Sequence, residues 1–253
     1  KHDLRNVWWV IDYNRQSLDS VVTDRLFGQI DRLFETMGWR VVTLKYGKLL
    51  RAAFARKGGE ELRRWIDDCP NSLYSALVFK GAAGWRDHLM KDLGKVPGIK
   101  ELLDEHDDAA LEELMTNLAG HCLETVLEAF HGIDDDRPTC FIAYTVKGYG
   151  LPFAGHKDNH AGLMNLDQME EFRRRNGIEE GREWERFAGL EHSEESLQGF
   201  LDEVAFAAEG RRRYTAPPVA VPAIPAPEGE RMSTQEAFGK VLGELSKDEG
   251  ELA

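Results

Sequence analysis

The sequence has few cysteines and no long apolar run, and both shortages exclude whole classes of protein. No apolar stretch approaches the ~20 residues that a membrane-spanning helix needs, and nothing near Lys1 resembles a secretory signal. The three cysteines, Cys69, Cys122 and Cys140, are odd in number and show no metal-binding spacing. This argues against a disulfide framework or a zinc site, so we expect free thiols, a cytoplasmic location and no membrane partner.

Positive charge is also scarce. Lys and Arg together number 32 against 45 Asp and Glu, which gives a formal net charge of −13. A general nucleic-acid-binding protein needs a basic face, and the chain is not expected to bind nucleic acid. The remaining composition, 42% hydrophobic and 30% charged, is that of an ordinary globular protein.

A polar loop follows the first apolar segment of the chain. Residues 7–11 read as a buried parallel strand, and the sequence Asn-Arg-Gln-Ser-Leu-Asp begins just after it, at Asn14. Ligands of open α/β sheets bind outside the carboxyl ends of the strands, and Mg²⁺ takes amide and carbonyl oxygens as ligands. Asn14 is therefore a candidate to hold a metal that in turn holds a phosphate. The alternative is that Asn14 is an ordinary turn former.

A second strand-to-loop segment lies far along the chain. An apolar stretch from Phe141 ends in Thr-Val-Lys-Gly-Tyr-Gly, with the lysine at Lys147, and a loop rich in glycine and histidine continues to Gly162. Long loops without a hydrophobic period are usually functional or disordered. Lys147 and His160 could meet an anion there. The alternative is a mobile surface loop with solvated histidines.

The hydrophobic pattern between these two segments predicts an α/β fold. Residues 23–37 have helical spacing and stop at Gly38, and residues 39–44 form the next strand. Residues 47–130 are mostly helical. One of these helices is expected to begin near Gly120, and Cys122, a poor N-cap, makes its start uncertain.

The last third of the chain contains a domain boundary. Residues 166–175 and 194–213 have helical patterns, and residues 214–230 hold five of the nine prolines, which predicts a semi-rigid linker. A capping box at Ser233 then opens a helix. We expect residues 231–253 to begin a second domain, and the chain to be part of a longer polypeptide.

Together the two strand-to-loop motifs resemble the thiamine-diphosphate enzymes of the transketolase type. The closest likeness is to the homodimeric E1 component of pyruvate dehydrogenase complexes. That family has an Asn-x-Gln-x-Leu-Asp motif, matched here from Asn14, and a Thr-(Ile/Val)-Lys-Gly-Tyr-Gly motif, matched from Thr145. The resemblance implies that residues 1–213 are the C-terminal portion of a diphosphate-binding domain with a doubly wound parallel sheet. Residues 231–253 would then start the pyrimidine-binding domain.

The resemblance also implies a role for each matching residue. The Asn14 side chain and the Gln16 backbone carbonyl would bind Mg²⁺, and Leu18 would contact the cofactor thiamine diphosphate. Lys147 would meet the substrate carboxylate, and His160 would lie near the reacting carbon. The carboxylate ligand of the metal belongs to a Gly-Asp-Gly type element of the family that this chain lacks.

The function implied is oxidative decarboxylation of a short 2-oxo acid, such as pyruvate or 2-oxobutyrate. The acyl group would pass to a lipoyl-bearing E2 acyltransferase, and the enzyme would be a homodimer. Two alternatives stay open, a transketolase that moves two carbons between sugar phosphates and a non-catalytic scaffold domain. His121 is expected to help packing, and the spacing of His156 from His160 differs from the histidine pair of transketolase.

Overall fold

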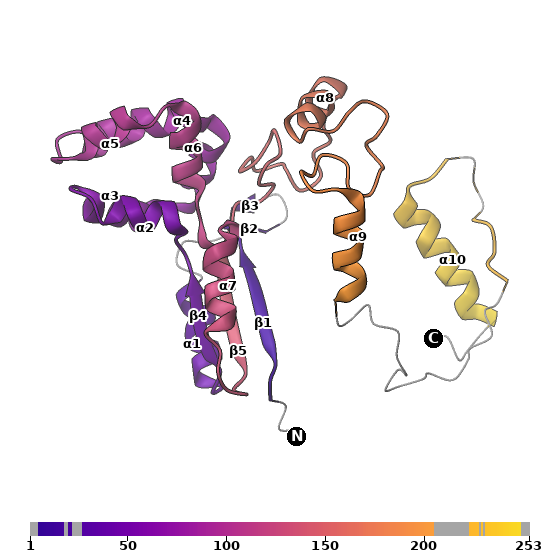
Figure 1. Ribbon diagram of the computed structural model, residues 1–253. Coiled ribbons are helices and arrows are strands. Elements are labelled where there is room, and N and C mark those ends of the chain that lie inside the picture. Colours follow the sequence, from indigo (N-terminus) through magenta and orange to yellow (C-terminus); the bar gives the residue numbers. More distant parts are fainter. Residues whose placement is uncertain are drawn as a thin grey trace. The chain divides into compact units, whose positions relative to one another are not determined.

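A computed structural model describes residues 5–17, 20–21, 27–204, 223–227, 229 and 231–248. The chain divides into two units, residues 1–190 and residues 191–253. The first unit holds the sheet and most of the helices (Figure 1). In the described part of the chain, no helix combines the length and the apolar character needed to cross a membrane.

The first unit is a mixed α/β structure with a small parallel sheet. The strands are β1 (Trp8–Tyr13), β4 (Arg40–Leu44) and β5 (Thr139–Tyr144), and they pair in the order β1-β5-β4 with all three parallel. Two short strands, β2 (Gln16–Ser17) and β3 (Ser20–Val21), form a separate antiparallel pair. The structure confirms the predicted α/β class as a mixed α/β unit with a parallel sheet. The β2–β3 pair was not predicted.

Each of the two units contains helices. The first unit contains α1 (Phe27–Thr36), α2 (Lys48–Phe54), α3 (Gly59–Asp68), α4 (Asn71–Leu93), α5 (Ile99–Glu105), α6 (Asp108–Thr116), the 3₁₀ turn η1 (Ala119–His121), α7 (Leu123–His131) and α8 (Leu166–Arg175). The second unit contains α9 (Glu194–Glu203) and α10 (Thr234–Asp248). The predicted helix at residues 166–175 matches α8.

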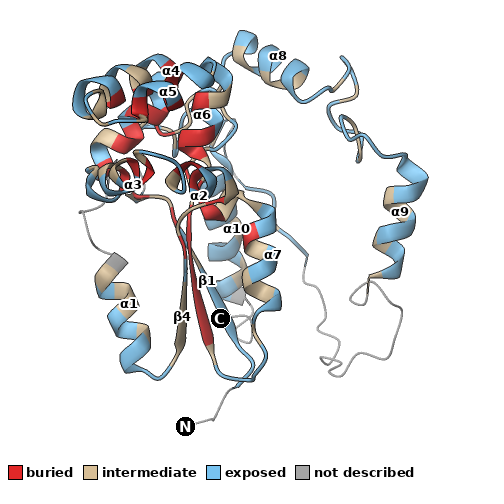
Figure 2. Cartoon of the chain, turned by 60° about the vertical axis from the view of Figure 1, so that its left-hand side comes forward, coloured by how far each residue is buried: buried red, intermediate tan, exposed pale blue. Residues whose placement is uncertain are grey.

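The central strand β5 is enclosed on both faces. Every residue of β5 is buried, because α1 and α7 cover opposite sides of the sheet. On one side Phe141 packs with residues of α7, and on the other Ile142 belongs to the large core cluster that α1 joins. Figure 2 shows buried residues concentrated in the sheet centre and in the helices beyond its upper end.

The first strand corrects one expectation. Residues 7–11 were predicted to be buried on both faces, yet Trp8, Trp9 and Val10 are 42%, 56% and 53% exposed. The reason is position, since β1 is an edge of the described three-stranded sheet and only one of its sides pairs with a neighbour. Trp8 still contacts Phe141 and Trp9 contacts Phe34 by ring edges.

The helices α2 to α6 form a layer at the carboxyl end of the sheet (Figure 1). Their inward faces make the main core, with Leu50, Leu77, Trp85, Leu102 and Leu111 all fully buried. This layer stands next to the loops that leave β1 and β5, and it therefore supplies one wall of any site at that edge.

Three other boundaries bear on the predictions. Helix α1 is described from Phe27 and ends at Thr36, just before Gly38 with φ of 82°, as the sequence indicated. The helix expected near Gly120 begins at Leu123, after the 3₁₀ turn η1, and Cys122 occupies its N-cap position without a side-chain cap hydrogen bond. Residues 205–222, which include most of the predicted linker, lie outside the described residues, so the boundary at 214–230 stays a prediction.

Removing a buried side chain of the helical layer should destabilise the first unit. Leu111→Ala deletes a fully buried side chain on α6, and such changes cost about 2–5 kcal/mol in the free energy of unfolding. The matched control is Leu123→Ala on α7, where the leucine is 70% exposed and a change of about 0.5 kcal/mol or less is expected. Urea unfolding followed by circular dichroism measures both, and equal losses in the two variants would contradict this packing.

Candidate functional site at the carboxyl edge of the sheet

The two loops identified from the sequence leave the sheet side by side. In the parallel pairing of β1 with β5, Tyr13 lies opposite Tyr144, and the Thr145 N–H donates a hydrogen bond to the Tyr13 carbonyl at 3.2 Å. Asn14 and Thr145 are therefore the first residues beyond adjacent strand ends. Segments about 130 residues apart in the sequence thus begin at one point in space.

Asn14 is held in a tight turn. Its side-chain oxygen Oδ1 accepts a hydrogen bond from the Gln16 N–H at 3.1 Å, the pattern of an Asx turn. Its amide Nδ2 donates to Asp12 Oδ2 at 3.2 Å. Asn14 therefore acts as a turn former. The second lone pair of its Oδ1 is still available for another ligand.

Asp12 links the two loops, and the sequence reasoning missed it. Its Oδ1 accepts a hydrogen bond from the Thr145 hydroxyl, while Oδ2 accepts from Asn14. The sequence did contain a signal for this contact. Residues two apart on one strand point to the same face, which places Asp12 next to Asn14.

Gln16 joins the first loop to the second directly. Its amide Nε2 donates to the Gly155 carbonyl at 3.1 Å, across 139 positions of sequence. Its other side-chain atom, Oε1, is buried and has no hydrogen-bond partner among the described residues. Buried polar atoms are nearly always paired, so Oε1 is an acceptor that a water or a ligand atom can satisfy.

Two hydrogen bonds to the Lys147 carbonyl hold the second loop together. That oxygen accepts from the Gly155 N–H at 3.1 Å and from the Asn159 side-chain amide at 2.9 Å. Gly155 has φ of 74°, and a Cβ built there would lie 2.7 Å from the Ser75 carbonyl of α4. Only glycine satisfies both the backbone conformation and this close approach.

These contacts enclose a small hollow between the loops and α4. Its volume is about 10 Å³, the space of one water molecule or one ion. The residues around it include Asn14, Arg15, Gln16, Tyr74, Ser75, Val78, Thr145, Val146, Lys147 and Gly155. The structure therefore brings three of the predicted site residues together, namely Asn14, Gln16 and Lys147.

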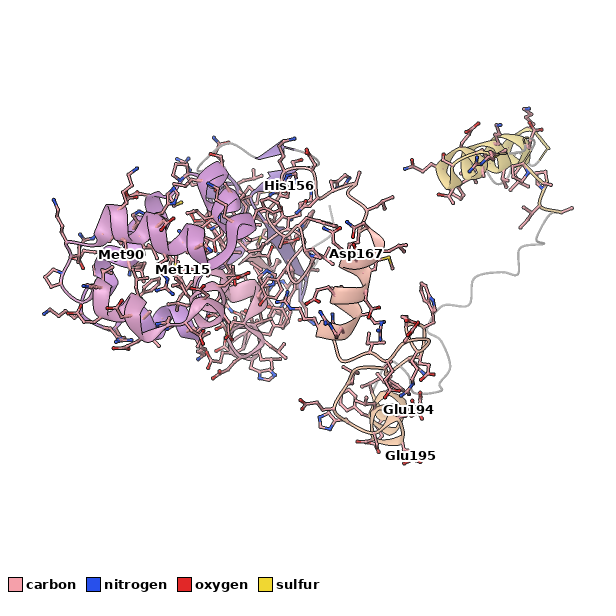
Figure 3. The ribbon with its side chains drawn as sticks, turned by 90° about the horizontal axis from the view of Figure 1, so that it is seen from above. Met90, Met115, His156, Asp167, Glu194 and Glu195 are labelled. Carbon is pink, nitrogen blue, oxygen red and sulfur yellow. The ribbon has the colours of Figure 1, made fainter. Side chains whose placement is uncertain are left out.

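The other two predicted site residues are not part of this group. His160 is exposed on the second loop and does not line the hollow. Leu18 lies outside the described residues. His156, which had the weaker case, packs its ring on Phe79 of α4 with centroids 4.6 Å apart and is labelled in Figure 3.

Arg15 is the second residue that sequence reasoning missed. It has φ of 66°, uncommon for a residue with a side chain, and it is only 5% exposed. Its guanidinium lies over the Tyr74 ring at 4.1 Å and near the Tyr144 ring at 5.2 Å. The only signal in the sequence was a long cationic side chain between two candidate ligands.

His121 supports the start of the second loop. Its Nε2 accepts a hydrogen bond from the Val146 N–H at 2.7 Å, and its ring stacks on Tyr149 with centroids 3.9 Å apart. Burial lowers the pKa of His121 below its ordinary 6.5, and the nearby Asp12 charge offsets part of this. The neutral ring is the form that can accept from Val146. These contacts match the packing role expected of His121.

The hollow offers oxygen donors to a hard cation, but Arg15 and Lys147 also line it, so a cation would bind there only together with an anion that offsets their charge. Mg²⁺ prefers amide, carbonyl and carboxylate oxygens, and Asn14 and Gln16 carry the first two kinds. Among the described residues no group of three or more His, Cys, Asp or Glu side chains could hold a metal. A metal here would therefore depend on amide and backbone oxygens, and the buried Oε1 of Gln16 shows that the pocket is polar.

Comparison with known proteins relates the chain to one group of enzymes. No model of a known protein family matches it. It is 25% identical over 279 residues to the pyruvate dehydrogenase E1 component of Cupriavidus necator, covering 98% of this chain and 29% of that protein. It is 26% identical over 182 residues to the E1 component of Escherichia coli, covering 69% of this chain and 20% of that protein.

The E1 component of Corynebacterium glutamicum is a third relative, 26% identical over 184 residues, or 70% of this chain and 19% of that protein. The chain is therefore a distant homologue of pyruvate dehydrogenase E1 components. It spans between about a fifth and three tenths of the length of these relatives.

Adding one methyl group at Gly155 should loosen the second loop. Gly155→Ala and Gly150→Ala share the cost of alanine at positive φ, but a Cβ at Gly150 meets nothing within 4 Å. Overpacking against Ser75 should add about 1–3 kcal/mol to the destabilisation at Gly155. Hydrogen exchange of residues 147–161 should be faster in Gly155→Ala than in Gly150→Ala, and equal rates would refute the close approach.

Lower pH should weaken the fold through His121. The unfolded chain binds the proton more readily than the folded chain, because the folded pKa lies below 6.5. Stability therefore falls as pH drops below about 6.5 and levels off below the folded pKa. His121→Gln keeps an acceptor that does not titrate, so it should flatten this part of the curve. Urea unfolding at several pH values tests this, and an unchanged slope in the variant would contradict it.

Proposed function

We propose that this chain is part of a thiamine-diphosphate-dependent 2-oxo acid dehydrogenase E1 component. The observation that carries the proposal is the hydrogen bond from Gln16 to Gly155, because it joins the two motif loops around one hollow. The distant homology to pyruvate dehydrogenase E1 components supports the same assignment. On this proposal the cofactors are thiamine diphosphate and Mg²⁺, and the protein is cytoplasmic.

The domain organisation follows from the proposal. Residues 1–213 would be the C-terminal portion of a diphosphate-binding domain with a doubly wound sheet, and the exposed edge strand β1 fits a sheet that continues beyond the described strands. Residues 214–230 would be a linker, and residues 231–253 would start the second domain. The complete enzyme would be a homodimer of a longer polypeptide.

Each loop residue has a task in this scheme. The Asn14 side-chain oxygen and the Gln16 backbone carbonyl would hold Mg²⁺ against the diphosphate, and Leu18 would contact the cofactor. When bound, thiamine diphosphate supplies a nucleophilic carbon and an electron sink for decarboxylation. The Asp12 carboxylate positions both loops through Asn14 and Thr145, which holds the metal ligands in place before cofactor arrives.

Lys147 and His160 would act on the substrate. Lys147 belongs to the second loop beside the hollow, and its ammonium would hold the carboxylate of a 2-oxo acid until CO₂ leaves. His160 is exposed on the same loop, where its imidazole could exchange a proton with substrate or with a lipoyl group that arrives from outside. The lipoyl group belongs to an E2 acyltransferase partner.

Kinetics of the full-length polypeptide test the proposal. Pyruvate or 2-oxobutyrate should be decarboxylated with transfer to a lipoyl acceptor, and xylulose 5-phosphate should not be a donor. Lys147→Ala and His160→Ala should each lower turnover by about a hundredfold while leaving the affinity for Mg²⁺-thiamine diphosphate near wild type. The control is Lys157→Ala, a lysine of the same loop that pairs with Asp158 and should keep full activity.

Two results would reject the assignment. Turnover of xylulose 5-phosphate with no activity on 2-oxo acids would place the protein with the transketolases. Normal kinetics in both Lys147→Ala and His160→Ala would remove these residues from the chemistry, whatever the substrate.

A further inference from the structure

Arg15 is a buried cation for which the described residues offer no carboxylate partner. The residue is 5% exposed, and its Nη1 is enclosed without a hydrogen-bond acceptor. Removing a guanidinium from water is costly unless an anion or several acceptors compensate. Most other charged side chains of the first unit lie at the surface, where water compensates them. Among the described residues of this unit, Arg15 is therefore the charge that most requires an acceptor.

Two tyrosine rings hold the guanidinium in position. Its central carbon is 4.1 Å from the Tyr74 centroid and 5.2 Å from the Tyr144 centroid. Aromatic faces attract a cation, but they do not accept the five N–H groups of an arginine as oxygen atoms do. Burial raises the pKa of Tyr74 to about 12, and its hydroxyl donates to the Met115 carbonyl at 2.8 Å. Tyr74 thus stays neutral and supplies no negative charge to Arg15.

Arg15 lines a cavity of about 430 Å³, within the size range of small-molecule sites. This cavity differs from the hollow between the loops, because the two share only Arg15 among their lining residues. Its lining also includes Lys45 and the polar side chains of Tyr13, Asn71 and Tyr144. Lys45 is already paired with Asp67, so among the described residues of the lining Arg15 is the cation whose charge is not compensated by a carboxylate.

Two acidic residues of the cavity do not neutralise Arg15. Asp67 forms an ion pair with Lys45 and accepts a hydrogen bond from the Tyr46 hydroxyl. Burial alone would raise the pKa of the Asp67 carboxyl, but these hydrogen bonds outweigh it and lower the pKa, so Asp67 is ionised and already paired. Asp68 is exposed, and water screens its charge.

We propose that the cavity lined by Arg15 binds a small organic anion, and that this anion supplies the charge missing at Arg15. The shared chemistry is an oxyanion, a carboxylate or a phosphate ester, which a guanidinium recognises through paired N–H donors. The site is separate from the proposed Mg²⁺ and thiamine diphosphate site, and it does not depend on that function. Because Arg15 lies between Asn14 and Gln16, occupancy would also stabilise the first loop.

Anion titrations of the full chain test this site. Inorganic phosphate and malonate are the two probes, and binding is followed by calorimetry and by the NMR signal of the Arg15 guanidinium. Wild type should bind at least one probe at millimolar concentration, with a shift of that signal. Arg15→Met should weaken binding at least tenfold, and Arg15→Lys should weaken it less because the charge remains. Asp68→Asn should tighten binding, since it removes the opposing charge.

The control is Lys157→Met, which removes one positive charge outside the cavity lining and should bind like wild type. Tighter binding of phosphate would point to a phosphate ester, and tighter binding of malonate to a carboxylic acid. Absence of binding by wild type would overturn the proposal. The proposal would also be overturned if folded Arg15→Met bound the probe as tightly as wild type does. It would equally be overturned if Arg15→Lys bound as tightly as wild type while the NMR signal of Arg15 in wild type did not shift.

Discussion

The parallel pairing of β1 with β5 is the constraint on which the site depends. The register that sets Tyr13 against Tyr144 determines that both strands end at the same level. Every contact between the two loops follows from this, including the Thr145 hydroxyl on Asp12 and the Gln16 amide on Gly155. A slip of one residue would turn all the side chains of β1 to the opposite face and would remove Asp12 and Asn14 from the second loop.

The helical layer supplies the remaining wall of the site. Helix α4 supplies Tyr74, Ser75 and Val78 to the hollow, and the close approach of Gly155 to the Ser75 carbonyl fixes the second loop against it. The site thus lies where the carboxyl edge of the sheet meets helix α4, and Gly155 brings the second loop into contact with that helix. Loops that pack against a sheet edge and a helix in this way position backbone carbonyls and amide oxygens more rigidly than an unsupported loop could.

The sequence allowed prediction of the α/β class and of the main strands to within a few residues, because apolar runs mark strands, and parallel strands share a carboxyl edge, which brings Asn14 and Lys147 together. That Gln16 joins them was implied by the resemblance to thiamine-diphosphate enzymes. The exposure of Trp8 and Trp9 could not be predicted, because an edge strand and a central strand can have the same composition. The burial of Arg15 depends on Tyr74 and Tyr144, which only the tertiary fold brings to it. The roles of Lys147, His160 and Leu18 are still predictions.

The most direct test of the account is whether both loops surround one metal ion. Mn²⁺ can replace Mg²⁺ in sites built from oxygen ligands, and its unpaired electrons broaden the NMR signals of nearby nuclei. With thiamine diphosphate and Mn²⁺ added to the full-length protein, the signals of Asn14, Gln16 and Lys147 should broaden together, and Asn14→Ala should abolish the effect. Broadening confined to one loop, or broadening that survives in Asn14→Ala, would contradict the account.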